Sequence, residues 1–135
     1  MTVYLGGPME GLTQKQMTEW RNYLTGVLES EKISVRDPCR RKKFHNQPYS
    51  INLANRITRM DLQDIDACDV MFANLSDPGH NGRGTVMEVM YAHMKGKIVI
   101  TVMPKGYNHP FIDYCSTEVH TDFYEAMKST INYYR

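Results

Sequence analysis

Short apolar segments typical of strands alternate with longer segments of helical periodicity along this chain. The strand-like segments are short, β-branched or aromatic, and lie at 2–6, 33–36, 69–73, 98–102 and, as a last short strand, 116–119. Apolar residues recur at helical spacing at 13–28, 51–67, 85–95 and 122–133. Strands that alternate with helices form parallel sheets, because each crossover helix returns the chain to the same end of the sheet. The pattern therefore predicts an α/β fold: a doubly wound, five-stranded parallel sheet in the order 2-1-3-4-5, with helices on both faces.

Chain length and charge narrow the class of protein. At 135 residues the sequence predicts one domain, 1–135, with a single core. Its 16 Lys and Arg residues nearly balance its 15 Asp and Glu residues, so we expect neither a nucleic-acid polymer nor a membrane as a partner. The basic run at 40–43 lies in a segment without periodicity, 39–50, and is interpreted either as a solvated loop or as a local phosphate clamp.

The cysteine and histidine residues favour neither a disulfide framework nor a metal site. The three cysteines are an odd number at wide spacings, which suits a reducing compartment, and we expect a cytoplasmic protein. The five histidines are scattered and form no pair at ligand spacing, so we predict no metal and no cofactor. Without an apolar run of 18 residues or a basic leader, neither a membrane span nor a signal peptide is expected.

The stretch 74–92 joins a buried strand to an amphipathic helix through a polar, glycine-bearing loop. Parallel sheets bind small ligands at such loops, outside the carboxyl ends of the strands. We place Glu88 in the first turn of the helix, where the helix dipole favours an ionised carboxylate. Glu88 is therefore a candidate nucleophile or charge stabiliser for an electron-poor carbon. The alternative is that it merely complements the helix dipole.

Other residues near this edge of the sheet have two interpretations. The loop 6–11 is rich in glycine but matches neither a dinucleotide fingerprint nor a P-loop, and Tyr4 before it is either core or catalytic. Of the acidic series at 61–69, most members are expected to pair with upstream arginines on a helix surface, whereas Asp69 opens a strand beside the presumed switch point. Three methionines on one helical stripe predict core or subunit packing: Met87, Met90 and Met94.

Six motifs occur in the same order as in a known family. They are Tyr4-Leu5-Gly6-Gly7-Pro8-Met9, the run from Asp61 to Val70, Ala73-Asn74-Leu75, Gly84-Thr85-Val86-Met87-Glu88 with Tyr91-Ala92, Gly96-Lys97-Ile98-Val99, and His109-Pro110-Phe111-Ile112. Together they resemble the nucleoside 2-deoxyribosyltransferase family over nearly the whole chain, and its short branch met in phage and bacterial genomes. The resemblance also extends to the deoxynucleoside 5′-monophosphate N-glycosidases, which share the fold and the glutamate.

The resemblance implies chemistry at the N-glycosidic bond of a 2′-deoxyribonucleoside. The glutamate at the position of Glu88 attacks the anomeric carbon, the aspartate at Asp69 binds sugar hydroxyls, and the tyrosine at Tyr4 hydrogen-bonds the nucleophile. A free nucleobase or water then takes the sugar. The protein is expected to be a homo-oligomer in which a neighbouring subunit contributes Asp113 and Tyr114. We expect the substrate to lie against Gly6, Gly7, Pro8, Met9, Asn74, Asp77, Asn81, Gly82, Arg83 and Gly84.

The sequence departs from the transferase pattern six residues before Glu88, where the family carries an aspartate and this chain has Gly82. Asp77, His80 or Asn81 are possible replacements, and the identity of the general acid stays open. A hydrolase of a deoxynucleoside 5′-monophosphate is the alternative function, with Arg83 or the run 40–43 supplying charge for a phosphate. A non-catalytic nucleotide-binding protein is the third.

Overall fold

The computed structural model describes residues 1–40, 47–80 and 82–135. In these ranges the strands are β1 (Thr2–Gly6), β2 (Ser34–Arg36), β3 (Val70–Asn74), β4 (Ile98–Val102) and β5 (Glu118–His120). The helices are α1 (Gln14–Ser30), α2 (Ile51–Asp66), α3 (Arg83–Met94), α4 (Pro110–Cys115) and α5 (Phe123–Asn132), with a 3-10 turn, η1 (Pro38–Arg40). None of the described helices is both long and apolar enough to cross a membrane.

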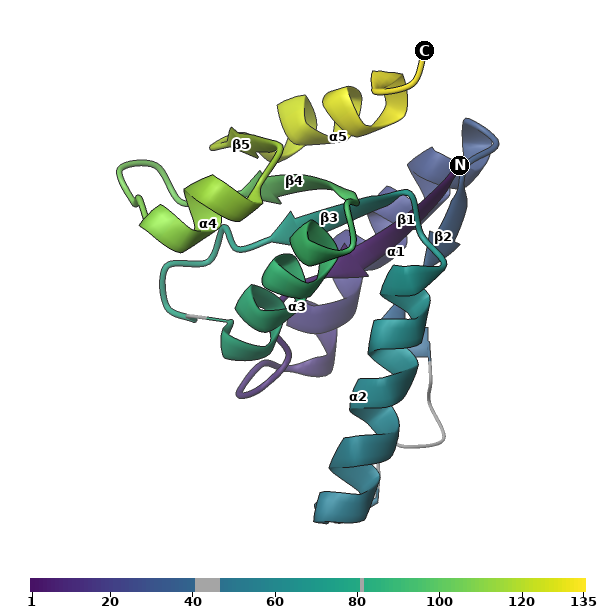
Figure 1. The fold of residues 1–135 in the computed structure, drawn as a ribbon, viewed down its shortest axis with the longest axis vertical. Helices are drawn as coiled ribbons and strands as arrows, with labels where there is room; N and C mark the ends of the chain where they lie inside the picture. The colour runs from purple at the N-terminus through teal and green to yellow at the C-terminus, as the bar shows by residue number, and fades with distance from the viewer. Residues whose placement is uncertain (41–46, 81) are drawn as a thin grey trace.

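The strands form one parallel sheet in the order β2-β1-β3-β4-β5 (Figure 1). This confirms the predicted doubly wound fold. The chain moves outward from β1 to β2, and then crosses to the other side of β1 to form β3. Loops that leave β1 and β3 therefore diverge, and a crevice opens outside the carboxyl ends of these two strands.

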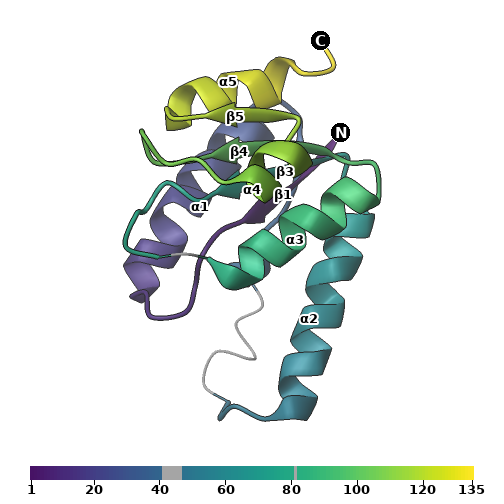
Figure 2. The ribbon, with the colours of Figure 1, turned by 60° about the vertical axis from the view of Figure 1, so that its left-hand side comes forward.

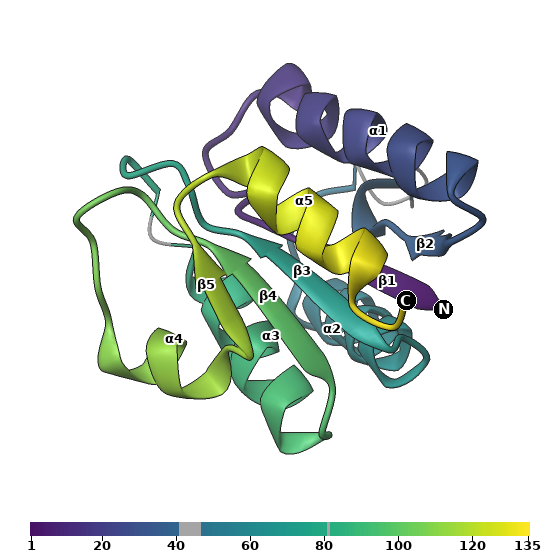
Figure 3. The same ribbon diagram turned by 90° about the horizontal axis from the view of Figure 1, so that it is seen from above.

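Alternate residues of the strands serve two separate cores. Val3 and Leu5 point to the face that α1 and α5 cover, where Phe72 packs against Trp20 and Phe123 at ring-centroid distances of 6.2 and 5.4 Å. Tyr4 points to the other face, which α2 and α3 cover. Figure 3 shows the two helical layers on opposite sides of the sheet. Because side chains alternate along a strand, the two faces of β1 are committed to different layers.

Two helix ends follow their sequence signals. Thr13 Oγ1 accepts a hydrogen bond from the Gln16 backbone N–H at 3.1 Å, and the Gln16 side chain accepts one from the Thr13 backbone N–H. The two bonds form a capping box at the start of α1. After α3, Gly96 adopts φ +72°, the left-handed conformation that ends a helix. Helix α2 has only Ile65 fully buried, and its first half extends beyond the sheet (Figure 2).

Several predicted boundaries need correction. Ile33 precedes β2, and β5, at Glu118–His120, begins two residues later and ends one residue later than expected. The segment predicted as a loop at 39–50 begins inside η1, and its residues 41–46 lie outside the described residues. Helix α4 is not predicted from the sequence, although His109 caps it and Pro110 occupies its first turn. Six residues are too few to establish a helical period, so only these end signals could have revealed α4.

Candidate active site

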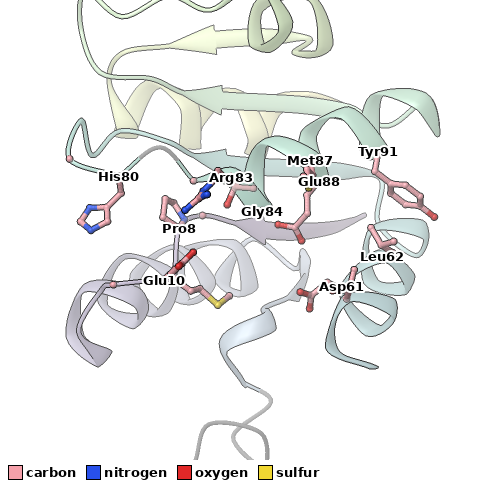
Figure 4. A pocket seen from close by; sticks show the side chains of 17 residues that line it. Pro8, Glu10, Asp61, Leu62, His80, Arg83, Gly84, Met87, Glu88 and Tyr91 are labelled. Carbon is pink, nitrogen blue, oxygen red and sulfur yellow. The ribbon is translucent and has the colours of Figure 1, made fainter. Parts of the chain in front are cut away.

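A cavity of about 790 Å³ opens at the carboxyl ends of β1 and β3 (Figure 4). Its walls come from the loop at 7–11, from α2, and from the loop and first turns of α3. The described side chains and backbone that line it are residues 7–11, Thr58, Asp61, Leu62, Gly79, His80, residues 82–85, Met87, Glu88 and Tyr91. A volume of this size falls in the range of small-molecule sites.

Glu88 lies on this cavity and is held by Tyr4. The Tyr4 hydroxyl, which is almost completely buried, donates a hydrogen bond to Glu88 Oε2. Burial and the neighbouring Glu88 carboxylate raise the pKa of Tyr4 far above its ordinary value. Tyr4 therefore stays protonated throughout the neutral range and acts as the donor, and Glu88 acts as the acceptor. The hydrogen bond fixes the orientation of one carboxylate oxygen at the cavity wall.

The reason for placing Glu88 at the start of a helix needs revision. Helix α3 begins at Arg83, two residues before the predicted start, so its first turn holds no acidic residue and Glu88 falls in the second. The dipole effect fades within the first turn, so it contributes little at Glu88. The Tyr4 hydroxyl donates a hydrogen bond to Glu88, which favours the ionised carboxylate.

Asp61 is a site residue that the sequence interpretation missed. Its carboxyl group reaches the cavity from α2, and Figure 4 shows Asp61 and Glu88 pointing into the same space from facing helices. Asp61 is also close enough to raise the pKa of Tyr4. The position of Asp61 in the sequence could have revealed it. Asp61 lies four residues after Ile57 and four before Ile65, so the three share the inward stripe of the helix. A carboxylate in an apolar stripe is unusual unless it serves a site.

The structure does not bring Asp69, which we expected at the site, to this cavity. Asp69 immediately precedes β3, at the amino end of the strand, whereas the cavity lies at the carboxyl end. A strand of five residues separates the two by about 17 Å. The Asp69 carboxylate instead accepts a hydrogen bond from the Thr2 backbone N–H at 2.8 Å, which ties the N-terminal strand to β3. Asp69 therefore has a structural role.

Of the predicted substrate-binding residues, Gly7, Pro8, Met9, Gly82, Arg83 and Gly84 line the cavity. Gly6, Asn74 and Asp77 do not. Gly6 ends β1 beneath the loop, and the Asn74 side chain accepts hydrogen bonds from the N–H and hydroxyl of Ser76 at 3.2 and 2.6 Å. Asp77 binds His80 Nδ1 at 2.9 Å, and it is His80 that lines the cavity. Asn81 lies outside the described residues.

The glycine at position 82 is required by the structure. Its φ of +60° is left-handed, and a Cβ there would come within 2.8 Å of the Leu75 side chain and 3.1 Å of Pro8. An aspartate at this φ would be strained, and its Cβ would require the Leu75 side chain to move, so the backbone found here favours glycine at position 82. Asp77 and His80 form a hydrogen-bonded pair on this loop, and His80 lines the cavity. The hydrogen bonds from the Gly79 N–H and from His80 lower the pKa of Asp77.

Two further predictions concern packing between subunits. Asp113 and Tyr114 lie on α4, where the Tyr114 ring meets His93 at 5.1 Å. A contribution from a neighbouring subunit therefore stays a prediction. The methionine stripe is not core, because Met87 and Met94 are each 74% exposed. Among the described residues, no group of three His, Cys, Asp or Glu side chains is placed to hold a metal ion.

Solved structures with the same fold include a 2-deoxyribosyltransferase from the psychrotolerant bacterium Bacillus psychrosaccharolyticus, with a TM-score of 0.74 and 18% identity over 97% of this chain and 96% of that one. A conserved protein from Enterococcus faecalis V583 also has a TM-score of 0.74, with 14% identity over 98% and 97% of the chains. The CMP N-glycosidase BcmB from Clostridium botulinum has a TM-score of 0.60 and 18% identity over 98% and 99%. At these identities the likeness shows the fold.

No curated protein matches the sequence. A family model does: the one described as nucleoside 2-deoxyribosyltransferase like matches residues 1–107, most of the chain. This match supports a role in glycosyl transfer or N-glycoside cleavage. The chain belongs to the nucleoside 2-deoxyribosyltransferase-like family.

Proposed function

We propose that the protein is a nucleoside 2-deoxyribosyltransferase, which cleaves the N-glycosidic bond of a 2′-deoxyribonucleoside and passes the sugar to another base. The observation that carries the proposal is the Glu88 carboxylate, fixed by Tyr4 on the wall of a cavity at the switch point. Membership of the family supports the choice of substrate class. The solved 2-deoxyribosyltransferase supports it through a shared fold.

The first step is nucleophilic. A Glu88 oxygen bonds to C1′ while the bond from C1′ to the base nitrogen breaks, and the base leaves with the bonding electron pair. The sugar is electron-poor in an oxocarbenium-like transition state, and an adjacent carboxylate stabilises that state. The sugar is then bound to the carboxylate as an ester. The departing base needs a proton to become neutral.

The second step reverses the first. A nitrogen of the incoming base attacks C1′ and loses its proton, the ester bond breaks, and Glu88 recovers its negative charge. Two displacements at one carbon retain the original configuration, as in the retaining glycosidases. The Tyr4 hydroxyl donates to the second Glu88 oxygen and keeps the reacting oxygen directed at C1′.

Asp61 is assigned to substrate positioning. It stands across the cavity from Glu88 on a different helix, so a bound nucleoside would lie between the two carboxyl groups. As an ionised carboxylate, Asp61 accepts hydrogen bonds from sugar hydroxyls or from base N–H groups. This replaces the role first expected for Asp69.

The active form is proposed to be a homo-oligomer. Met87 lines the cavity and is 74% exposed, and Met94 lies two turns further along α3 with the same exposure. A second subunit packed on this stripe would therefore meet the cavity rim. Asp113 and Tyr114 are the residues proposed to reach a neighbouring site, and Tyr114 is 76% exposed.

One observation favours a second candidate, an N-glycosidase of a deoxynucleoside 5′-monophosphate. Arg83 lines the cavity at the start of α3, where a guanidinium and the backbone N–H groups of the first turn suit an anion. In this reading water replaces the second base. Pro8 lies in the first loop where those hydrolases use a serine, which leaves Arg83 as the principal phosphate contact among the lining residues.

One incubation separates these functions. The protein is mixed with a 2′-deoxyribonucleoside and a different free base, and products are resolved by chromatography. A new nucleoside supports transfer, free deoxyribose without exchange supports hydrolysis, and saturable binding without products supports a non-catalytic binder. Glu88→Gln should abolish turnover, and Glu125→Gln, an exposed glutamate on α5 paired with Lys128, serves as the matched control. A 5′-monophosphate should compete only weakly; tight competition that Arg83→Ala removes would favour the hydrolase.

A further inference from the structure

An arginine is the largest fully buried side chain among the described residues. Arg21, on the second turn of α1, has no exposed surface. Arginine is rarely buried without a specific partner, because its charge loses hydration. The functional site described above does not account for this burial.

The guanidinium makes two hydrogen bonds to backbone carbonyls and faces one carboxylate. Nη1 donates to Met17 O at 2.8 Å, one turn earlier in α1, and Nη2 donates to Gly7 O at 2.9 Å. Nε lies 3.7 Å from Asp37 Oδ1, and both side chains are within 2% of full burial. Nε has no hydrogen-bond acceptor among the residues that the structure describes. Asp37 is itself fixed, because its Oδ1 accepts from the Cys39 N–H at 2.9 Å.

These contacts join the two loops that leave β1 and β2. Gly7 is the first residue after β1 and lies on the cavity wall, whereas Asp37 follows β2 on the neighbouring strand. The loop is pressed against α1: a Cβ on Gly7 would come within 2.7 Å of the Trp20 ring and 3.2 Å of Arg21 Nη2. The Arg21 guanidinium also stacks over Trp20, 4.5 Å from the ring centroid. Arg21 therefore holds the Gly7 carbonyl from behind the cavity wall.

We propose that Arg21 is a positioning residue of the active site, and that its buried pair with Asp37 fixes the 7–11 loop against which the substrate lies. The inference rests on the proposed function for its catalytic part only. An apolar side chain of the same volume would avoid the cost of desolvating a charge. We therefore attribute the arginine at this position to the Gly7 carbonyl and the Asp37 carboxylate that its guanidinium contacts. The positive charge of Arg21 also lowers the pKa of Tyr4, against the larger effects of burial and Glu88 that raise it.

The test compares Arg21→Lys and Arg21→Met with a matched control, Arg135→Met. Arg135 also pairs with a carboxylate and a carbonyl, both on Glu31, at 3.0 and 3.2 Å, but its side chain is 50% exposed and does not line the cavity. Lysine keeps the charge and loses the planar fork that reaches a carbonyl and a carboxylate together. Methionine keeps most of the volume and loses the charge.

We expect both Arg21 variants to lower kcat/KM for the deoxynucleoside by about 10- to 100-fold, with a raised KM. A merely structural role would reduce the fraction of folded enzyme, which lowers the apparent kcat and leaves KM unchanged. Amide hydrogen exchange at 7–11 should speed up while exchange in β3 and β4 stays as in the wild type. Arg135→Met should change neither kcat/KM nor the exchange rates at 7–11. The proposal is overturned if KM is unchanged, or if exchange rises equally across the sheet.

Two further measurements keep the test decisive. If Arg21→Met does not fold, the test uses Asp37→Asn and Arg21→Lys instead. Asp37→Asn keeps the shape of the side chain and removes the charge that faces Arg21. It should likewise speed exchange at 7–11, and unchanged exchange there would contradict the proposal. If the wild type has no activity on deoxynucleosides, the proposed function fails, and the exchange experiment still decides whether Arg21 fixes the loop.

Discussion

Replacing Tyr4 by phenylalanine isolates the hydrogen bond on which the proposed chemistry depends. Tyr4 is 1% exposed and belongs to the core beneath α2 and α3, so phenylalanine keeps the packing of the ring and removes only the hydroxyl. A hydrogen bond to a charged group contributes about 1.5–3 kcal/mol. Since about 1.4 kcal/mol corresponds to a factor of ten in rate, Tyr4→Phe should lower kcat/KM by about 10- to 100-fold.

The same variant should change the pH dependence. The Tyr4 hydroxyl favours the ionised form of the Glu88 carboxylate, because it donates to that form. Without it, the carboxylate becomes protonated at a higher pH, and the acid limb of the profile of kcat/KM against pH moves upward. The measurement is the initial rate of base exchange from about pH 3 to pH 8, a window that extends to both sides of the ordinary carboxyl pKa.

Two comparisons decide the interpretation. Tyr23→Phe, on the exposed surface of α1, is the control and should leave both the rate and the profile unchanged. In the double variant Tyr4→Phe with Glu88→Gln, the loss should equal that of Glu88→Gln alone, because both changes act through one pair. A Tyr4→Phe enzyme within twofold of the wild-type rate and with an unmoved acid limb would refute the reasoning.

The remaining predictions concern stability and reactivity. Phe72→Ala should lower the free energy of unfolding by about 3–5 kcal/mol in chemical denaturation, because Phe72 is fully buried; a loss below about 1 kcal/mol would contradict the described core. A thiol reagent should label no cysteine of the native protein and all three after unfolding, because the three are buried and burial raises the pKa of Cys68 to about 11; rapid native labelling would contradict this. The hydrogen bonds from Ser129 and His120 lower the pKa of Glu118, so they stabilise the fold above the ordinary carboxyl pKa and are lost as the pH falls through the lowered value. Ser129→Ala should therefore cost about 0.5–1.5 kcal/mol at pH 7 and less near pH 3, and an equal cost at both would argue against the pair.

The sheet could be predicted from the sequence because each of its strands is bounded by a local signal. Segment 98–102 is a continuous β-branched run, and Gly96 ends the helix before it. Alternation with helices then leaves few topologies. Short elements were harder to place: the six-residue α4 was not predicted, and the three-residue β5 was predicted to begin two residues too early, because neither is long enough to show a period. Contacts with β4 and α3 determine where these two elements lie.

The candidate site could be predicted only in part. The cavity lies at the carboxyl ends of the strands, so a residue that follows a strand can reach it and a residue that precedes a strand cannot. Glu88 and the glycine loop were found from their place after strands. Asp69 was misplaced because it precedes its strand, and Asp61 was overlooked because its inward position on α2 was read as surface charge. The buried Arg21 joins three segments far apart in sequence, and no spacing rule anticipates such a contact.

The central claim is that Glu88 forms a bond to C1′, and mass spectrometry of the digested protein tests it directly. The enzyme is mixed with a deoxynucleoside in the absence of an acceptor base, quenched in acid and digested. The account predicts a mass increase of one deoxyribosyl group on the peptide that contains Glu88, absent from Glu88→Gln and removed when a free base is added before quenching. A modification on another residue, or base exchange that proceeds at the wild-type rate in Glu88→Gln, would contradict it.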